Sequence, residues 1–321
     1  MNCNYCEFRC DLSQTPGVCE RYVIRDGEVV EKEPFSWLST NTSDMESMPF
    51  FHVMPGEYVL HVGTVGCNAG CDYCINSHVA IRHEPEEALQ RITPDEMVKY
   101  AKNCDSRAIV FAINEVAVFL PSALAVAGLA RENGLKTGCL TNGFLTEEAA
   151  ARLAEKMDYI CVSLKSIDDG FYRNRLRLPS VAPVLRNIRA FGQGPHVEIV
   201  TPVDKDVSYD ELREIANFIY DVNPETPWHL FQMFKAHKTD EDQSRSFEDT
   251  FAFIKETRRR LPYTYFASFP GSPWVDTLCP KCGHRVVRRV SIGACGSKYL
   301  SDELTADDRC PECGQSILMK R

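Results

Sequence analysis

Cysteine is the residue that most constrains this chain. The 321-residue sequence contains 15 cysteines, and twelve of them lie in three close-set regions, the last of which includes the spare Cys295. The opening residues, MNCNYCEFRC, lack the basic and apolar regions of a secretory signal, so we expect a reducing, cytoplasmic location. Close-set cysteines in such a compartment more often bind metal than form disulfides. We therefore expect a fold organised around metal sites.

The rest of the composition is that of an ordinary globular protein, with 44% hydrophobic and 25% charged residues. The net charge of −9 argues against a nucleic-acid-binding surface. Apolar stretches are interrupted, for example at Asn114 and Glu115, before they approach the roughly 18 residues of a membrane span. We expect no nucleic-acid partner and no membrane. Three isolated cysteines, Cys104, Cys139 and Cys161, are assigned to packing.

Short β-branched runs alternate with helical patterns between about residues 58 and 268, which predicts βα units around a parallel sheet. The expected strands are Val59–Thr64, Ala108–Ile113, Thr137–Thr141, Tyr159–Leu164, Val197–Thr201, His229–Met233 and Thr264–Ser268. Capping boxes at Thr93–Glu96 and Ser208–Glu211 mark helix starts. Six or so units are too few for a closed eight-unit barrel. We therefore predict an α/β fold with a partial, open (β/α)6 barrel.

The flanks divide the chain into three predicted regions: a Cys-rich N-terminal segment over residues 1–50, the partial barrel over 51–270, and a zinc-ribbon-like module over 271–321. The last region contains two C-x2-C pairs, formed by Cys279, Cys282, Cys310 and Cys313. Paired spacing of this kind is typical of structural zinc, and a rubredoxin-like iron site is the alternative. Cys295 is spare, and we assign it to packing.

The N-terminal group has the spacing C-x2-C-x3-C-x8-C and consists of Cys3, Cys6, Cys10 and Cys19. Four thiols this close can form a metal site. Their spacing does not decide between zinc and an auxiliary iron–sulfur cluster, and we favour zinc.

The central group, Cys67, Cys71 and Cys74, has the spacing C-x3-C-x2-C and follows the first predicted barrel strand. A [4Fe–4S] cluster normally takes four cysteines, so a loop with three leaves one iron able to bind another ligand. Gly66 and Gly70 allow the backbone to curl around a bulky group. The loop lies at the carboxyl end of a strand, where barrel active sites are built. A structural zinc knuckle is the alternative.

With Tyr73 before its last cysteine, the triplet resembles the signature of the radical S-adenosylmethionine (SAM) enzymes. Further stretches resemble the radical enzymes of the AmmeMemoRadiSam system, a group related to pyruvate formate-lyase activating enzymes. These stretches include Phe50–Gly56, Ile113–Glu115, Leu140–Phe144, Leu164–Lys165 and the C-terminal Cys-Pro-x-Cys-Gly pairs. The resemblance implies a [4Fe–4S] cluster on the triplet whose unique iron binds SAM. Reductive cleavage of SAM then yields methionine and a 5′-deoxyadenosyl radical.

The resemblance also implies roles for particular residues near the cluster. Asn114 and Glu115 occupy the segment that contacts the methionine amine, and Lys165 fits as a cation for the methionine carboxylate. Ser163 stands where the activating enzymes have an aspartate. The implied cofactor contacts are Tyr73, Asn114, Glu115, Thr141, Asn142, Ser163 and Lys165. His229 is expected at the same end of the barrel, and Lys165 and His229 are the candidate catalytic residues.

The resemblance implies hydrogen abstraction from a protein or peptide, as in activating enzymes, with electrons from a reductant such as flavodoxin or ferredoxin. One alternative is radical modification or rearrangement of a small molecule. Another is a non-enzymatic iron–sulfur electron-transfer protein. Both enzyme hypotheses predict 5′-deoxyadenosine on reduction in the presence of SAM, whereas the electron-transfer hypothesis predicts none.

Overall fold

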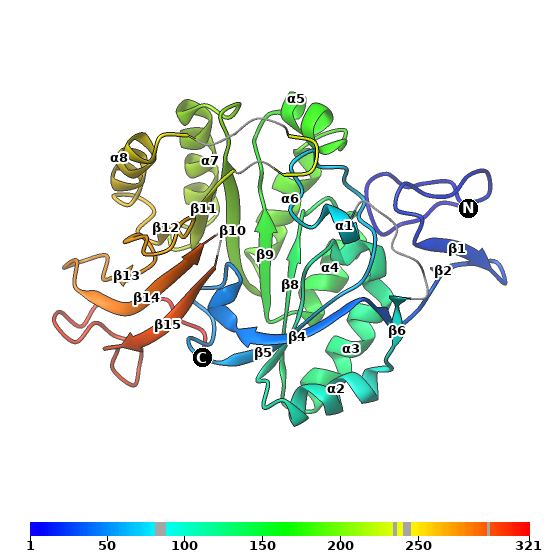
Figure 1. The fold of residues 1–321 in the computed structure, drawn as a ribbon, viewed down its shortest axis with the longest axis horizontal. Helices are drawn as coiled ribbons and strands as arrows, with labels where there is room; N and C mark the ends of the chain where they lie inside the picture. Colours follow the sequence, from blue (N-terminus) through cyan, green and yellow to red (C-terminus); the bar gives the residue numbers. More distant parts are fainter. Residues whose placement is uncertain (81–87, 234–235, 240–244, 294–295) are drawn as a thin grey trace.

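The computed structural model describes residues 1–80, 88–233, 236–239, 245–293 and 296–321. Its centre is an eight-stranded sheet in the order β12-β11-β10-β9-β8-β7-β5-β4 (Figure 1). The strands are β4 (Ser39–Asp44), β5 (Tyr58–Gly63), β7 (Ala108–Phe111), β8 (Lys136–Thr141), β9 (Tyr159–Ser163), β10 (His196–Val203), β11 (Trp228–Gln232) and β12 (Thr264–Phe266). All are parallel except β4, which is antiparallel to β5.

The seven predicted strands are confirmed, each within two residues of its expected ends. In the portion of the chain that the structure describes, β4 and β12 are the two edges of the sheet and do not pair with each other. The sheet is therefore open, and the predicted α/β partial barrel is confirmed. No helix among the described residues is both long and apolar enough to cross a membrane.

Helices connect the parallel strands and pack on one face of the sheet (Figure 1). The larger ones are α2 (Pro94–Asn103), α3 (Leu120–Glu132), α4 (Glu147–Lys156), α6 (Ala182–Phe191), α7 (Tyr209–Val222) and α8 (Phe247–Thr257). Short helical segments are η1 (Met45–Ser47), α1 (Ser77–Ala80), η3 (Val116–Phe119), α5 (Asp169–Phe171) and the π-helical turn η4 (Tyr172–Leu176).

The two predicted capping boxes have different outcomes. Thr93 and Glu96 form the complete reciprocal pair at the start of α2. At α7 the Ser208 side chain accepts the Glu211 amide as expected, but the Glu211 carboxylate accepts hydrogen bonds from the Ser166 hydroxyl and the Ile167 amide instead. The second box is therefore half formed, because Glu211 fixes the loop after β9.

Alternate strand residues face opposite sides of the sheet. Leu60 and Ile109 face the helices, whereas Val59 and Val110 contact a second core contributed by residues 45–54. That segment covers the amino-end half of the face that lacks helices. Toward the carboxyl ends of the strands, the same face has apolar residues that are only partly buried, namely Ile113, Leu140 and Phe231.

The two flanking segments differ in how they join the barrel. The N-terminal one forms the hairpin β1 (Tyr22–Arg25) and β2 (Glu28–Glu31), and its strand β3 (Ser36–Trp37) pairs with β6 (Gln90–Arg91) of the barrel region. Its last strand, β4, is an edge of the main sheet, although it lies within the predicted Cys-rich segment that ends at residue 50. The C-terminal one is the antiparallel sheet β13 (Thr277–Leu278), β14 (Arg285–Gly293) and β15 (Gly296–Asp302). Cys295 lies outside the described residues.

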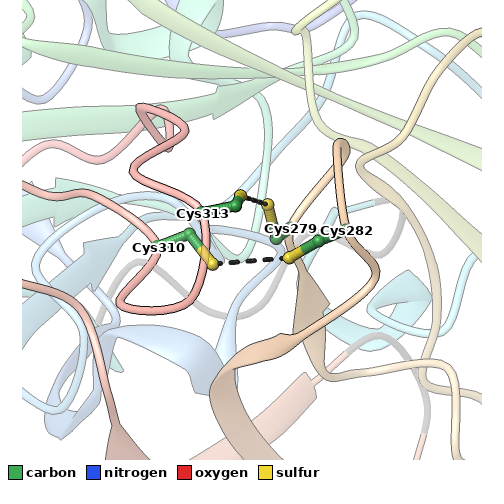
Figure 2. A group of neighbouring side chains, drawn as sticks. All are labelled: Cys279, Cys282, Cys310 and Cys313. Atoms are coloured by element: carbon green, nitrogen blue, oxygen red, sulfur yellow. Dashed lines mark hydrogen bonds between the residues drawn. The ribbon is translucent and has the colours of Figure 1, made fainter.

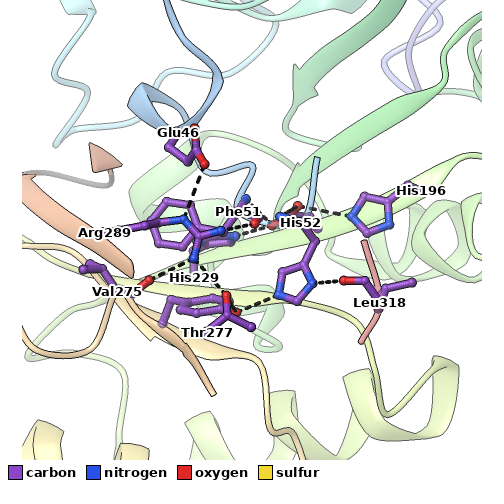
Figure 3. A network of polar contacts seen from close by, with 11 residues as sticks. Glu46, Phe51, His52, His196, His229, Val275, Thr277, Arg289 and Leu318 are labelled. Atoms are coloured by element: carbon purple, nitrogen blue, oxygen red, sulfur yellow. Dashed lines mark hydrogen bonds and ion pairs between the residues drawn. The ribbon is translucent and has the colours of Figure 1, made fainter. Parts of the chain in front are cut away.

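A buried polar network fastens the C-terminal module to the amino-end half of the sheet (Figure 3). The carboxylate of Glu198 accepts the backbone amides of Phe51 and His52 at 3.1 and 2.9 Å, and lies 3.1 Å from His196 Nε2 and 2.6 Å from His229 Nε2. Burial alone would raise the pKa of Glu198, but its hydrogen bonds to His196 and His229 outweigh burial and hold that pKa well below its usual range.

His52 and Arg289 extend this network into the module. His52 Nδ1 lies 2.5 Å from the Leu318 carbonyl, and Nε2 lies 2.6 Å from the Tyr265 hydroxyl. Burial lowers the pKa of His52 to about 3. Arg289 of β14 lies 4.7 Å above the Phe51 ring, donates to the Phe51 carbonyl and is 3.5 Å from Glu46. Buried, desolvated polar groups thus hold the C-terminal module against the barrel.

We expect acid to destabilise the protein through His52. The unfolded chain takes up this proton near pH 6.5, whereas the folded chain keeps His52 neutral down to about pH 3, so stability falls as the pH drops through that window. Glu198 adds to this loss of stability below about pH 4.5, because its carboxylate takes up a proton in the unfolded chain while it stays ionised in the folded chain. Urea unfolding between pH 7.5 and 4.5 measures the slope, up to about 1.4 kcal/mol per pH unit for one proton.

The variant His52→Gln is expected to flatten this slope between pH 6 and 4.5. The matched control is His78→Gln, which replaces a histidine of α1 that lies outside this network and should keep the wild-type slope. An unchanged slope in His52→Gln would show that another group takes up the proton.

Candidate functional site

The three central cysteines lie on the loop after β5, at the carboxyl edge of the sheet. Backbone hydrogen bonds to neighbouring segments hold this loop: the Gly70 amide donates to the Leu176 carbonyl at 2.8 Å and the Asp72 amide to the Arg175 carbonyl at 3.1 Å. Both carbonyls belong to the π-helical turn η4. A Cβ on Gly70 would lie 3.1 Å from Arg177 Cγ, so glycine permits the loop to approach this turn closely.

The three cysteines are partly buried. Burial raises the pKa of Cys71 to about 11 and also raises the pKa values of Cys67 and Cys74. The positive charge of Lys165 acts in the opposite direction on Cys71 and Cys74. The loop therefore favours thiolates when a further positive charge, such as a bound metal group, is present.

Tyr73 and Lys165 lie together next to these thiols. The Lys165 ammonium is 5.9 Å from the centre of the Tyr73 ring. Tyr73 is buried, and its hydroxyl has no hydrogen-bond partner among the residues that the structure describes. Ser163, two residues before Lys165, ends β9 and is partly exposed. A cation and an unsatisfied buried hydroxyl at one place suit a polar ligand.

Arg175 ties the loop to the end of β10. Its guanidinium contacts three carboxylates: Asp72 at 2.6 Å, Asp206 at 2.5 Å and the fully buried Asp204 at 3.3 Å. It also lies 5.4 Å from the centre of the Tyr73 ring. Because Asp72 stands between Cys71 and Tyr73, this clamp fixes the middle of the cysteine motif.

Asn114 and Glu115 make contacts within the protein. Asn114 Oδ1 accepts the Thr64 amide at 3.0 Å, and its Nδ2 donates to the Gly66 carbonyl at 2.8 Å. Glu115 accepts the Thr141 hydroxyl at 2.8 Å and the Asn142 amide at 2.6 Å. Burial raises the pKa of Glu115 despite these bonds. The two side chains position the cysteine loop and the loop after β8; their contacts with a cofactor stay predictions.

Asn142 completes this network. Its Nδ2 donates to Asn68 Oδ1 at 2.7 Å, and its Oδ1 accepts the Phe144 amide at 2.9 Å. The structure thus brings seven residues to the carboxyl edge of neighbouring strands, where the sequence predicts them: Tyr73, Asn114, Glu115, Thr141, Asn142, Ser163 and Lys165.

His229 lies elsewhere, and its expected position is wrong. It is the second residue of β11, pairs with Val200 and Tyr265, and is hydrogen bonded to Glu198 in the amino-end network (Figure 3). A strand advances by about 3.3 Å per residue, so a residue at the start of a strand cannot share the loop edge reached at its end. We therefore leave His229 out of the proposed active site.

The four C-terminal cysteines form a compact thiol group (Figure 2). Sulfur–sulfur distances are 3.5 Å for Cys279 and Cys313 and 3.6 Å for Cys282 and Cys310, and all four sulfurs lie within 4.8 Å of one another. Four thiolates around one zinc ion at about 2.3 Å would be separated by about 3.8 Å. The geometry fits a single tetrahedral ion.

Sequence reasoning missed Asn68, Asp72, Arg175 and Asp204. Asn68 and Asp72 lie inside the C-x3-C-x2-C motif, so their position could have identified them as residues of the site. Arg175 and Asp204 come from segments more than a hundred residues away, and nothing in their spacing connects them to the motif.

Comparisons with known proteins agree with this geometry. Residues 62–219, from β5 into α7, match the family described as the Radical SAM superfamily. The uncharacterized protein MJ0808 of Methanocaldococcus jannaschii is 27% identical over 324 residues, which cover 94% of this chain and 93% of that protein.

The fold is similar to solved structures of SuiB from Streptococcus suis. The structure bound to S-adenosylmethionine has a TM-score of 0.52 and 14% identity, and the match covers 70% of this chain and 51% of SuiB. The structure bound to the precursor peptide SuiA has a TM-score of 0.51 and 13% identity, with 68% and 49% covered. This chain thus spans about half the length of SuiB. Residues 62–219, which include the three-cysteine loop, are therefore a radical SAM superfamily domain.

Proposed function

We propose that this protein binds a [4Fe–4S] cluster at Cys67, Cys71 and Cys74, binds SAM beside it, and abstracts hydrogen from a protein or peptide. The observation that carries the proposal is the three-thiol loop at the carboxyl edge of the sheet with Lys165 next to it. Three thiols from one loop suit a cluster with one open iron. When bound, the cluster and SAM supply a 5′-deoxyadenosyl radical by one-electron reduction.

The chain's own residues supply position and charge. Lys165 pairs with the carboxylate of the methionine moiety, and its ammonium favours thiolate at Cys71 and Cys74. Arg175 keeps the loop in place through Asp72, and Asn114 does so through Thr64 and Gly66. These groups are held before any ligand binds, which lowers the ordering cost of binding.

The open shape of the sheet is consistent with a large substrate. Its edges β4 and β12 do not meet within the described residues, and the face without helices is least covered near the carboxyl ends of the strands. There Ile113, Leu140 and Phe231 present partly buried apolar surface. SuiB, a protein with a similar fold, is known in complex with its precursor peptide. We propose that a peptide segment enters here, with flavodoxin or ferredoxin as the electron donor.

The C-terminal module has a structural role in this proposal. We assign a zinc ion to Cys279, Cys282, Cys310 and Cys313, because their sulfur spacing suits one tetrahedral ion. We also propose a reducing, cytoplasmic location, because close-set cysteines that bind metal are typical of such a compartment.

Each of the variants Cys67→Ala, Cys71→Ala and Cys74→Ala is expected to abolish SAM cleavage. After anaerobic reconstitution, dithionite and SAM should yield 5′-deoxyadenosine with the wild type and none with the variants, as measured by mass spectrometry. The matched control, Cys104→Ala, replaces the residue that caps the end of α2 and should retain activity. Wild-type protein that binds iron but forms no 5′-deoxyadenosine would contradict the proposed reaction.

Arg175→Met is expected to loosen the cysteine loop, because Asp72 and the buried Asp204 lose their partner. We expect iron to be lost to a chelator about tenfold faster than from wild type, equivalent to about 1.4 kcal/mol. Absorbance at visible wavelengths follows this loss. Arg213→Met is the control, since Arg213 pairs with Asp210 and Glu256 on the exposed helix surface. Equal rates for both variants would show that the clamp does not hold the loop.

Removing one C-terminal thiol should remove zinc while sparing the iron. Cys310→Ser is expected to lose about one zinc per chain and to lower Tm by at least about 5 °C, because the metal crosslinks two distant segments. Elemental analysis and thermal unfolding measure both effects, with Cys104→Ser as the control. A variant that loses iron and keeps its zinc would mean that the cysteine groups are wrongly divided.

A further inference from the structure

The N-terminal cysteines form a second thiol site beside the catalytic loop. Cys3, Cys6, Cys10 and Cys19 line one pocket together with Tyr22, Val118 and Asn68. Cys3 and Cys6 are buried, whereas Cys10 and Cys19 are partly exposed. Burial is the main cause that raises the pKa values of Cys3, Cys6 and Cys19 to about 11, and charge on neighbouring cysteines of the group raises them further. The four cysteines therefore line one partly buried space.

Their spacing differs from that of the C-terminal site. Among the described residues, the C-terminal cysteines are the one group of three or more ligand side chains with all donor atoms within 4.8 Å. The N-terminal sulfurs share a pocket but are not drawn together in this way. A single zinc ion requires four sulfurs about 3.8 Å apart, whereas a cubane cluster binds each thiolate through a different iron and holds them farther apart.

The backbone around the pocket is arranged to support sulfur ligands. Backbone amides two residues further along the chain oppose the effect of burial on the pKa values of three thiols: Tyr5 acts on Cys3, Phe8 on Cys6 and Arg21 on Cys19. A Cβ on Gly17 would stand 3.6 Å from Cys10 Sγ and 3.2 Å from Leu12 Cδ2, so glycine keeps this side of the pocket free. Amide hydrogen bonds to sulfur are a feature that tunes iron–sulfur clusters.

Asn68 connects this pocket to the catalytic loop. It directly follows Cys67, whose sulfur lies 3.9 Å from Asn68 Oδ1. The same side chain lines the N-terminal pocket and is 1% exposed, and its amide acts on Cys6, lowering the pKa of that thiol against the larger effect of burial. A buried amide nitrogen at a thiol-lined pocket suits an acceptor such as a cluster sulfide or thiolate.

The N-terminal segment is fixed firmly against the barrel. Cys6 pairs with Leu145 in an isolated antiparallel bridge, and the Thr146 hydroxyl donates to the Asn4 carbonyl at 2.7 Å. Tyr5 stacks on Tyr22 with ring centres 4.4 Å apart. These contacts keep the N-terminal pocket at a constant distance from the loop that contains Cys67.

We propose that Cys3, Cys6, Cys10 and Cys19 bind a second iron–sulfur cluster, which passes electrons to the cluster at Cys67, Cys71 and Cys74 by way of Asn68. A low-potential one-electron donor is oxidised as the N-terminal cluster is reduced, and that cluster is reoxidised as the central one gains the electron. No bond forms or breaks in this step. The inference that these four cysteines bind a cluster does not depend on the proposed function, whereas the electron transfer to the central cluster rests on it. At these four cysteines, this proposal replaces the zinc ion that the sequence analysis favours.

The test is metal analysis after anaerobic reconstitution with iron and sulfide. Wild type should bind about eight irons and the triple variant Cys67→Ala/Cys71→Ala/Cys74→Ala about four, with an EPR signal on reduction. The double variant Cys6→Ala/Cys19→Ala should also bind about four, and Cys104→Ala about eight. Zinc should stay at about one per chain throughout.

Two results would overturn the proposal: a triple variant without iron, or a second zinc that disappears in Cys6→Ala/Cys19→Ala. A triple variant that keeps its cluster while the wild type fails to cleave SAM would leave the second site intact and defeat only the proposed function. Asn68→Ala tests the link. In the triple-variant background it should lower the reduction potential of the N-terminal cluster, because an N–H donor to sulfur stabilises the reduced state. Asn41→Ala, on the exposed stretch of β4, is the control.

Discussion

The loop from Gly66 to Cys74 lacks regular secondary structure, so its backbone groups need partners from other segments, and this requirement shapes the active-site edge. The π-helical turn η4 meets some of this need, since the carbonyls of Arg175 and Leu176 at its end are free to accept the amides of Asp72 and Gly70. Asn114 meets more of it by accepting from Thr64 and donating to the Gly66 carbonyl. Three thiols can face one ligand because the backbone behind them is already satisfied.

Much of this arrangement could be predicted from the sequence. The strands were found because buried parallel strands are apolar runs, such as Ala108–Phe111, and the residues after them meet at one edge because the strands are parallel. The sequence does not predict which groups a polar side chain contacts at this edge of the sheet. Glu115 has the residue type and position of a ligand contact, yet its oxygens are occupied by Thr141 and Asn142. Only the tertiary structure supplies those partners.

His229 illustrates a different limit. A histidine near a strand end can belong to either edge of the sheet, and a shift of a few residues along the strand decides which. The structure uses it at the amino end, where Glu198 accepts from two histidines and two amides. A buried carboxylate without these partners would be strongly destabilising. The network therefore specifies how the C-terminal module sits on the barrel, since another orientation would separate Arg289 from Glu46 and the Phe51 carbonyl, and His52 from the Leu318 carbonyl.

The three cysteine groups show why residue spacing alone does not identify a metal. Each contains a C-x2-C pair, so this local spacing is the same in all three. The groups differ in what surrounds them: two pairs from distant segments closing to 3.5 and 3.6 Å at the C-terminus, three thiols with a lysine at the barrel edge, and four thiols around a pocket that also contains Asn68. A single ion pulls its ligands together, whereas a cluster fills the space between them. Sulfur separation and the polar groups facing that space therefore carry the information that the motif lacks, and here they favour a single zinc ion at the C-terminal group and iron–sulfur clusters at the other two.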